Sequence, residues 1–417
     1  MDVNSHLLLE QPKLSKIEMF LVFWLICISG NPLFGEFGGK YIYALTAIGA
    51  LIISIYYGRK LYSLKLILVL FASVVLFTLQ STILSEISVL ANANFLARIY
   101  LGFLITAVLG NKFRFAYMKV MFFVAIVSLV FWLINALVDF PGIEFDRYRS
   151  IVIFNYIPNT DLYGVFRRNC GMFWEPGAYQ GLIMLVPLMF IGQIKELWQQ
   201  YRIECVILIL ALLSTMSTTG YLVFAVLIML VMFKNVRNIF FRTVVAASSL
   251  VVFIWAYNTV DFLGEKIENE YESAMELGAN EASWSRMGAL QVDINNIKRH
   301  PILGNGFSMH EKYGQLGDKM AGSGNGFSGA LNMFGMPFMF LYFYILYRNT
   351  PARTKYESLI FPIIIMLLLN GEYFLNYPFF WSLIFVQYPN INLYETDSNI
   401  DDSVQSQGNN REVFAAG

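Results

Sequence analysis

The feature that most constrains this chain is a series of apolar stretches, each close to the roughly 20 residues that a helix needs to cross the hydrocarbon of a bilayer. Clear examples are residues 64–84, 90–110 and 115–138. Hydrophobic residues make up 57% of the chain and charged residues 14%, far from the composition of ordinary soluble domains. The sequence therefore predicts an all-α polytopic membrane protein. Its net charge of +0 gives no general attraction to nucleic acid.

The apolar pattern predicts about twelve transmembrane helices. We expect them at residues 17–29, 41–57, 64–84, 90–110, 115–138, 177–193, 203–216, 220–233, 239–260, 327–347, 359–374 and 378–388. Lys and Arg concentrate in alternate short loops, and the positive-inside rule then places both termini in the cytoplasm. With no cleavable signal evident, the first apolar run is expected to be retained as a membrane anchor.

This pattern divides the chain into six parts, of which the two long loops outside the cytoplasm are the expected site of function. We expect N-terminal spans in 1–138, a first long periplasmic loop in 139–176, spans in 177–260, a second long periplasmic loop in 261–326, spans in 327–388 and a disordered cytoplasmic tail in 389–417.

The stretch "GVFRRNCGMFWEPGAYQGL" places two arginines just before the outer end of an apolar helix. Proline is favoured at the first helical position, so Pro176 makes Glu175 the N-cap. Arg167 and Arg168 then lie beside the positive end of a helix dipole, an arrangement suited to phosphate. Alternatively, the arginines contact lipid head groups and Glu175 only caps the helix.

Arg98 lies inside an apolar stretch, where an arginine costs at least roughly 2.5 kcal/mol on insertion scales. Such a residue indicates either a functional site or a structural pairing, for which Glu372 is the carboxylate that we consider.

The second long loop carries a segment in which Met287, Leu290, Ile294 and Ile297 recur at helical spacing, which predicts an amphipathic helix on the outer face. Arg286 opens this segment and is a candidate ligand contact. Lys298 and Arg299 are expected to face water. His310 is a candidate general base near neutral pH, although a lone loop histidine is usually incidental.

Two further stretches mark outer helix ends. The glycine-rich "AGSGNGFSGALNMFG" allows a close backbone approach to an anion or a sugar, and "STMSTTG" either binds sugar hydroxyls or caps two helices. No GxxxxGK[ST], HExxH, GxSxG or Asp-x-Asp pattern is present in the sequence. A lipid pyrophosphate held by arginines therefore fits better than a metal-held nucleotide sugar.

The motifs "RRNCGMFWEPGAYQGL", "STTG", "SWSRMGALQVDINNIKRHPILGNGF" and "GSGNGFSGALNMFGMPFMF", in this order, resemble the O-antigen polymerase and ligase superfamily, in particular the Wzy-type polymerases. The resemblance implies a GT-C-like membrane glycosyltransferase. It would polymerise oligosaccharide repeat units carried on undecaprenyl pyrophosphate, by inverting transfer without a metal or another cofactor. The implied partners are the lipid-linked oligosaccharide, membrane lipids, a flippase and a chain-length regulator.

Residue by residue, the resemblance implies catalytic roles for Arg168, Arg286 and Glu175. It implies substrate contacts from a further set, Arg98, Arg167, Gly171, Trp174, Tyr179, His310 and Asn325. Two departures stand out. Thr218 replaces an arginine often found in the Ser-Arg-Thr-Gly pattern, and Gly324 and Asn325 stand where ligases place a histidine. The second departure favours a polymerase over a ligase. A lipid-linked oligosaccharide flippase is the competing class, although no internal repeat typical of transporters is evident.

Overall fold

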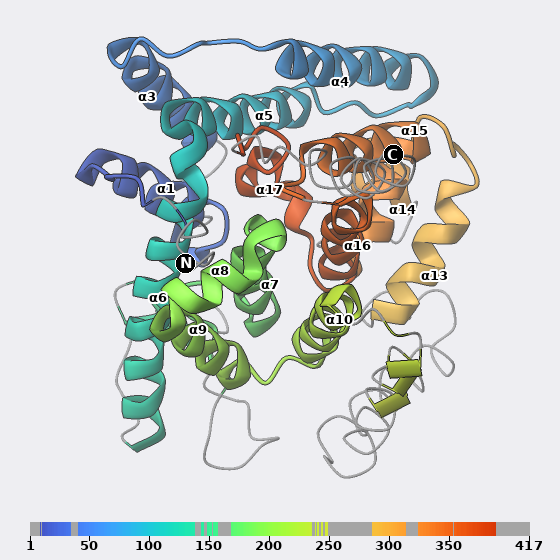
Figure 1. Ribbon diagram of the computed structural model, residues 1–417. Helices are drawn as coiled ribbons and strands as arrows, with labels where there is room; N and C mark the ends of the chain where they lie inside the picture. The colour runs from blue at the N-terminus through green and yellow to red at the C-terminus, as the bar shows by residue number, and fades with distance from the viewer. Residues whose placement is uncertain are drawn as a thin grey trace, which may run out of the picture.

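The structure is a computed structural model, and it is mostly helical (Figure 1). It describes residues 9, 11–34, 41–137, 143–145, 148–151, 153–156, 168–235, 286–313, 324–352 and 354–388, with a few positions between 238 and 248. The predicted span at 239–260, most of the second long loop and the predicted C-terminal tail lie largely or wholly outside the described residues.

Apolar helices form most of the chain. The N-terminal half contains α1 (Lys16–Ile28), α3 (Ile42–Tyr56), α4 (Leu64–Ile83), α5 (Val89–Leu109), η2 (Gly110–Lys112) and α6 (Phe113–Leu137). The centre contains α7 (Pro176–Met189), η4 (Ile191–Gln193), α8 (Ile194–Gln200), α9 (Arg202–Ser214) and α10 (Thr218–Asn235). The remainder contains α13 (Arg286–Ile297), α14 (Met309–Tyr313), α15 (Gly326–Asn349), α16 (Lys355–Gly371), η7 (Phe374–Asn376) and α17 (Pro378–Ser382).

Several of these helices are suited to a membrane. Three helical segments are long and apolar enough to cross a bilayer, namely α4, the α5–α6 pair and α15, and α7 with α8 makes a fourth that is bent by 58°. The α5–α6 pair turns a corner at η2 (Figure 1). The chain is thus a multi-pass membrane protein, while the expected count of about twelve spans stays a prediction. At the twelfth predicted span, 378–388, the structure has the five-residue helix α17 followed by turns.

The all-α expectation is wrong in the first long loop, where three short strands form an antiparallel sheet in the order β1-β2-β3. They are β1 (Ile143–Phe145), β2 (Tyr148–Ile151) and β3 (Phe154–Tyr156). The segment "YRSIVIFNY" is rich in β-branched and aromatic residues, which favour strands over helix. In this sheet Phe154 is buried and packs against Phe131 of α6, with ring centroids 5.5 Å apart.

Packing of aromatic side chains holds the centre of the molecule together. Trp381 of α17 is 1% exposed and contacts Phe95 of α5 and Tyr342 of α15, each with ring centroids 5.0 Å apart. Gly102 of α5 permits this approach, because a Cβ there would lie 2.9 Å from the backbone oxygen of Pro378. The α17 helix is therefore buried against α5 in the middle of the fold (Figure 1).

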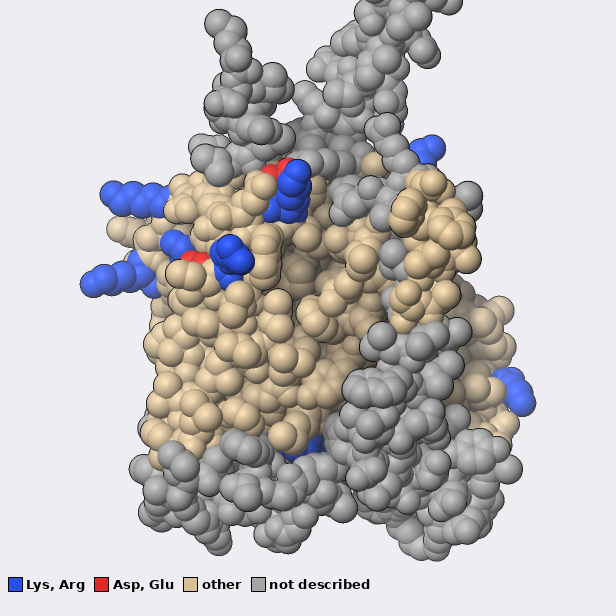
Figure 2. Space-filling view, turned by 60° about the horizontal axis from the view of Figure 1, so that its bottom comes forward, with Lys and Arg blue, Asp and Glu red and all other residues tan. Residues whose placement is uncertain are grey.

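Large apolar side chains also cover the outer surface, as the membrane environment requires. Examples are Leu45 and Ile52 on α3, Phe71 on α4 and Phe123 on α6, all more than half exposed. Figure 2 shows a broad face nearly without charge among its described residues, with Lys and Arg gathered mainly along one edge.

The amphipathic helix predicted in the second long loop is confirmed as α13, but the predicted buried face is wrong. Ala289, Val292, Asp293 and Asn296 are buried, whereas Ile294 is 46% exposed. The polar residues turn inward because Asp293 accepts hydrogen bonds from Ser328 and Asn332 of α15, against which α13 packs.

Candidate functional site

Helix α7 begins as the sequence predicts, with Glu175 at the N-cap and Pro176 at the first helical position. The Glu175 backbone is extended, with φ −148° and ψ 154°, and its side chain makes no capping hydrogen bond. Gly177, the second residue of α7, lies directly against Glu372. The contact is so close that a Cβ on Gly177 would overlap Glu372 Oε1. The positive end of α7 thus faces a buried carboxylate that comes from the end of α16.

Trp174 fixes the position of that carboxylate. Its indole Nε1 donates to Glu372 Oε2 over 3.1 Å, and its ring stacks on Tyr377 with centroids 4.8 Å apart. The backbone nitrogen of Trp174 donates to the carbonyl of Gly30, just after α1. Three separate parts of the sequence therefore meet at this tryptophan.

Arg98 reaches the same region from α5. Its Nη1 donates to Asn376 Oδ1 over 3.3 Å, and its guanidinium lies 4.6 Å from the ring centroid of Tyr43 on α3. Asn376 is within reach because Gly102, one turn after Arg98, lets Pro378 approach α5. Arg98 thus hydrogen-bonds an amide four residues beyond Glu372, the carboxylate considered from the sequence as its structural partner.

The N-terminus of α15 contacts the same region through Asn325. Asn325 is its N-cap, and the side-chain oxygen accepts from the backbone nitrogens of Phe327 and Ser328. Its Nδ2 donates to Asn370 Oδ1 over 3.2 Å. We call residues 370–377 together with Arg98, Trp174 and Asn325 the junction. It contains an arginine, a carboxylate and several amides between the N-termini of α7 and α15.

Arg168 lies at a neighbouring place, the turn between α9 and α10. Its Nε donates to the carbonyl of Thr215 over 3.3 Å, and it interacts electrostatically with Tyr221 of α10. Next to it, Asn169 is buried and its Nδ2 donates to Ser214 Oγ over 2.9 Å. The "STMSTTG" turn therefore holds the arginine of the first loop in place.

The remaining predicted residues fall in different places. Arg167 lies outside the described residues, and Arg286 is the first residue of α13, with its side chain not described. His310 of α14 is exposed, and its Nδ1 lies 3.9 Å from Glu86 Oε1, between α4 and α5. No described contact joins Arg98, Arg168 and His310, so the meeting of the arginines in one cavity stays a prediction.

Tyr179 and Gly171 are parts of the core. Tyr179 is fully buried, and its hydroxyl lies 2.8 Å from Ser128 Oγ of α6. Gly171 has φ +58°, and a Cβ on it would lie 3.0 Å from the Tyr179 ring. Both residues therefore contribute to core packing in this structure.

Sequence reasoning missed Asn376 and Tyr377, which link Arg98 to Trp174 through the 370–377 segment. The signal was present as "NGEYFLNYP", a polar interruption between two apolar segments that ends in proline. In a membrane protein, such an interruption with irregular backbone is tolerated where it is buried in protein or lines a cavity.

The chemistry of the junction suits the binding of an oxyanion. Arg98 Nε is buried and has no hydrogen-bond partner among the described residues, so a donor remains for a ligand oxygen. Arginine and helix N-termini both favour phosphate-type anions.

Comparison with protein families gave a match to a family described as O-antigen ligase, over residues 204–343. This segment runs from α9 to α15 and includes the "STMSTTG" turn, α13 and the start of α15. The match supports the O-antigen ligase/polymerase superfamily. Members of this family are membrane enzymes of glycosyl transfer, which supports the same coarse activity in polysaccharide biosynthesis here. Searches matched no curated protein and no solved structure.

Proposed function

We propose that this protein is a polysaccharide polymerase of the inner membrane that joins oligosaccharide repeat units linked to undecaprenyl pyrophosphate. The junction carries the proposal, because it brings a membrane arginine with a spare donor to a tryptophan and a carboxylate at two helix N-termini. The family match supports glycosyl transfer in general, and the departures at Gly324 and Asn325 favour polymerisation.

In the proposed reaction, the hydroxyl oxygen of the incoming repeat unit attacks the anomeric carbon of the growing chain. The bond from that carbon to the pyrophosphate oxygen breaks, and the configuration inverts. Glu175 takes the proton of the hydroxyl. Arg98, Arg168 and Arg286 stabilise the departing pyrophosphate by charge-assisted hydrogen bonds, without a metal.

The test replaces Arg98 by Gln and by Lys in protein reconstituted with a defined lipid-linked repeat unit. We expect Arg98→Gln to lower the rate of chain extension about 100-fold, the scale of losing one donor that stabilises a developing anion. Arg98→Lys should restore part of the rate. Arg59→Gln is the control, because Arg59 is an exposed cation just beyond α3. Equal rates for wild type and Arg98→Gln, at equal folded protein, would refute the assignment. Glu175→Gln tests the base, since undiminished turnover rules it out.

O-antigen ligase is the second candidate, because the matching family carries that description. The same preparation separates the candidates. Longer glycans formed from lipid-linked units alone indicate a polymerase, whereas transfer only onto an added lipid A–core acceptor indicates a ligase. A flippase would move the lipid-linked units across vesicles without changing their length.

A further inference from the structure

A buried arginine lies at the other end of α7 from the junction. Arg114, in the first turn of α6, is 4% exposed, and its Nη1 donates to Gln193 Oε1 of η4 over 2.7 Å. Its guanidinium also lies over two rings, 4.9 Å from the centroid of Phe115 and 4.7 Å from that of Phe190. These partners are all uncharged.

Among the described residues, the positive charge of Arg114 therefore has no counter-ion. No carboxylate in the described part of the chain forms an ion pair with it. Burying an unpaired guanidinium carries a large desolvation penalty, to which neutral amides and ring faces give only partial compensation. An arrangement of this kind is expected where an anion completes the site.

Three polar atoms around Arg114 point to the same conclusion. Its own Nε and the hydroxyls of Tyr201 and Tyr388 are buried without a hydrogen-bond partner among the described residues. Tyr201 is 4% exposed, and its ring centroid lies 6.5 Å from that of Phe115, over which the Arg114 guanidinium lies. Tyr201 and Tyr388 are both within electrostatic range of Arg114. Because an arginine N–H and two phenols can all donate, the missing partner is an acceptor with several oxygens.

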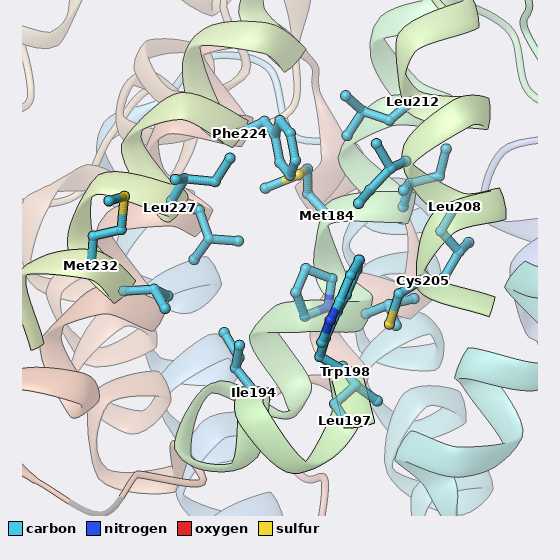
Figure 3. Close-up of a pocket in the computed structure, with 16 residues that line it drawn as sticks. Met184, Ile194, Leu197, Trp198, Cys205, Leu208, Leu212, Phe224, Leu227 and Met232 are labelled. Atoms are coloured by element: carbon cyan, nitrogen blue, oxygen red, sulfur yellow. The ribbon is translucent and has the colours of Figure 1, made fainter. Parts of the chain in front are cut away.

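An apolar cavity of about 290 Å³ lies between α7, α8, α9 and α10 (Figure 3). This is about twice the roughly 150 Å³ of an apolar cavity that holds a benzene ring. Every residue that lines it is apolar, and Leu197, Trp198 and Cys205 lie at its edge (Figure 3). Some side chains that line the cavity, such as Trp198, Ile228 and Met232, are partly exposed. The cavity therefore lies at the surface of the protein.

The cluster and the cavity are continuous along the chain. Tyr201 stands where α8 ends and α9 begins. Its backbone nitrogen donates to the carbonyl of Leu197, and its carbonyl accepts from the backbone nitrogen of Cys205. Tyr201 therefore stands between two residues that line the cavity, with its hydroxyl among the groups around Arg114.

We propose that this is a binding site for one anionic phospholipid. Its phosphate group is held by Arg114, Tyr201 and Tyr388, and a hydrocarbon chain fills the cavity between α7 and α10. The site lies at the end of α7 opposite the junction, so it is separate from the proposed pyrophosphate site. A phosphate supplies the oxygens that the donors lack, and the chain supplies the apolar surface that the cavity requires.

The experiment measures lipid retained by the purified full-length protein in detergent, by native mass spectrometry. The probes are phosphatidylglycerol and phosphatidylcholine with identical chains. We expect wild type to retain one phosphatidylglycerol in preference to phosphatidylcholine, and Arg114→Gln to lose roughly tenfold to a hundredfold in affinity. The double variant Tyr201→Phe/Tyr388→Phe keeps the packing and should also lose about tenfold. Leu227→Phe narrows the cavity, so it should weaken the binding of long-chain phosphatidylglycerol but not that of short-chain phosphatidylglycerol.

Controls separate this site from general attraction to positive charge. Lys195→Gln removes an exposed cation of α8 at the same end and should leave retention unchanged. Inorganic phosphate should not raise the melting temperature at concentrations where phosphatidylglycerol does. Equal retention of the two lipids, wild-type affinity in Arg114→Gln, an equal loss in Lys195→Gln, or stabilisation by inorganic phosphate alone would each overturn the proposal.

Discussion

The buried polar groups around Asp293 and those around Arg114 differ in how fully they are paired. Asp293 accepts hydrogen bonds from Ser328, Asn332 and Tyr313, which come from two other helices. Arg114 has one neutral acceptor and lies near donors that have no partner in the described part of the chain. The first cluster therefore stabilises the fold by itself, whereas the second is complete only with a ligand.

Removing the acceptor from the paired cluster is expected to have the largest effect on stability. Asp293→Ala leaves several buried donors without a partner, which costs roughly 1–3 kcal/mol for each group and more in a charged network. We expect a loss of about 3 kcal/mol or more, measured by thermal unfolding in detergent. Asn295→Ala on the exposed side of α13 is the control. Similar melting temperatures for Asp293→Ala and Asn295→Ala would show that the hydrogen bonds to Asp293 do not stabilise the fold.

The junction is a further region that contains buried polar groups, and its close packing can be tested through glycine. A Cβ on Gly326 would overlap the carbonyl oxygen of Glu372 and lie 2.7 Å from Tyr373 Cα. Because backbone atoms cannot easily yield, Gly326→Ala should cost about 1–3 kcal/mol. Gly49→Ala is the matched control, since a Cβ at Gly49 in α3 meets nothing within 4 Å. A melting temperature for Gly326→Ala as high as that of the control would show that the junction is loosely packed.

The pairing around Asp293 also predicts a dependence on pH. Burial lowers the pKa of Lys312 to about 8, although the nearby Asp293 opposes the shift. The unfolded chain, with a lysine pKa near 10.4, then binds more protons than the folded chain above pH 8. Stability should rise from about pH 8 towards 10, by at most about 1.4 kcal/mol per pH unit. Lys312→Met should remove this part of the slope in a pH series of unfolding curves. If the stability of wild type and of Lys312→Met changed with pH in the same way, titration of Lys312 would be excluded as the cause of the slope.

Part of this architecture could be predicted from sequence. Apolar length located the helices, and Pro176 located the start of α7. The buried face of α13 could not be predicted, because apolar periodicity favours burial of Ile294 and exposure of Asp293. In the structure Asp293 is buried and Ile294 is exposed, since Asp293 accepts hydrogen bonds from Ser328 and Asn332.

The same limit applies to the candidate sites. Arg98 and Trp174 were recognisable as unusual residues in their segments, but their partners lie far away in the sequence. From the sequence, the charge of Arg114 indicates only an inner loop. Its burial depends on how η4 and α8 fold back on α6, which no local pattern encodes.

The smallest effect is the most discriminating, because its sign depends on the lipid. Tyr313→Phe removes a donor to Asp293 and should cost about 1 kcal/mol under all conditions. Tyr388→Phe removes a buried hydroxyl without a partner, so in lipid-free detergent it should be neutral or stabilise by up to about 1 kcal/mol. With phosphatidylglycerol added, the same change should reduce the stabilisation that wild type gains. If Tyr388→Phe lowered the melting temperature equally with and without lipid, the hydroxyl would have a partner in the protein, and the two clusters would not differ as described.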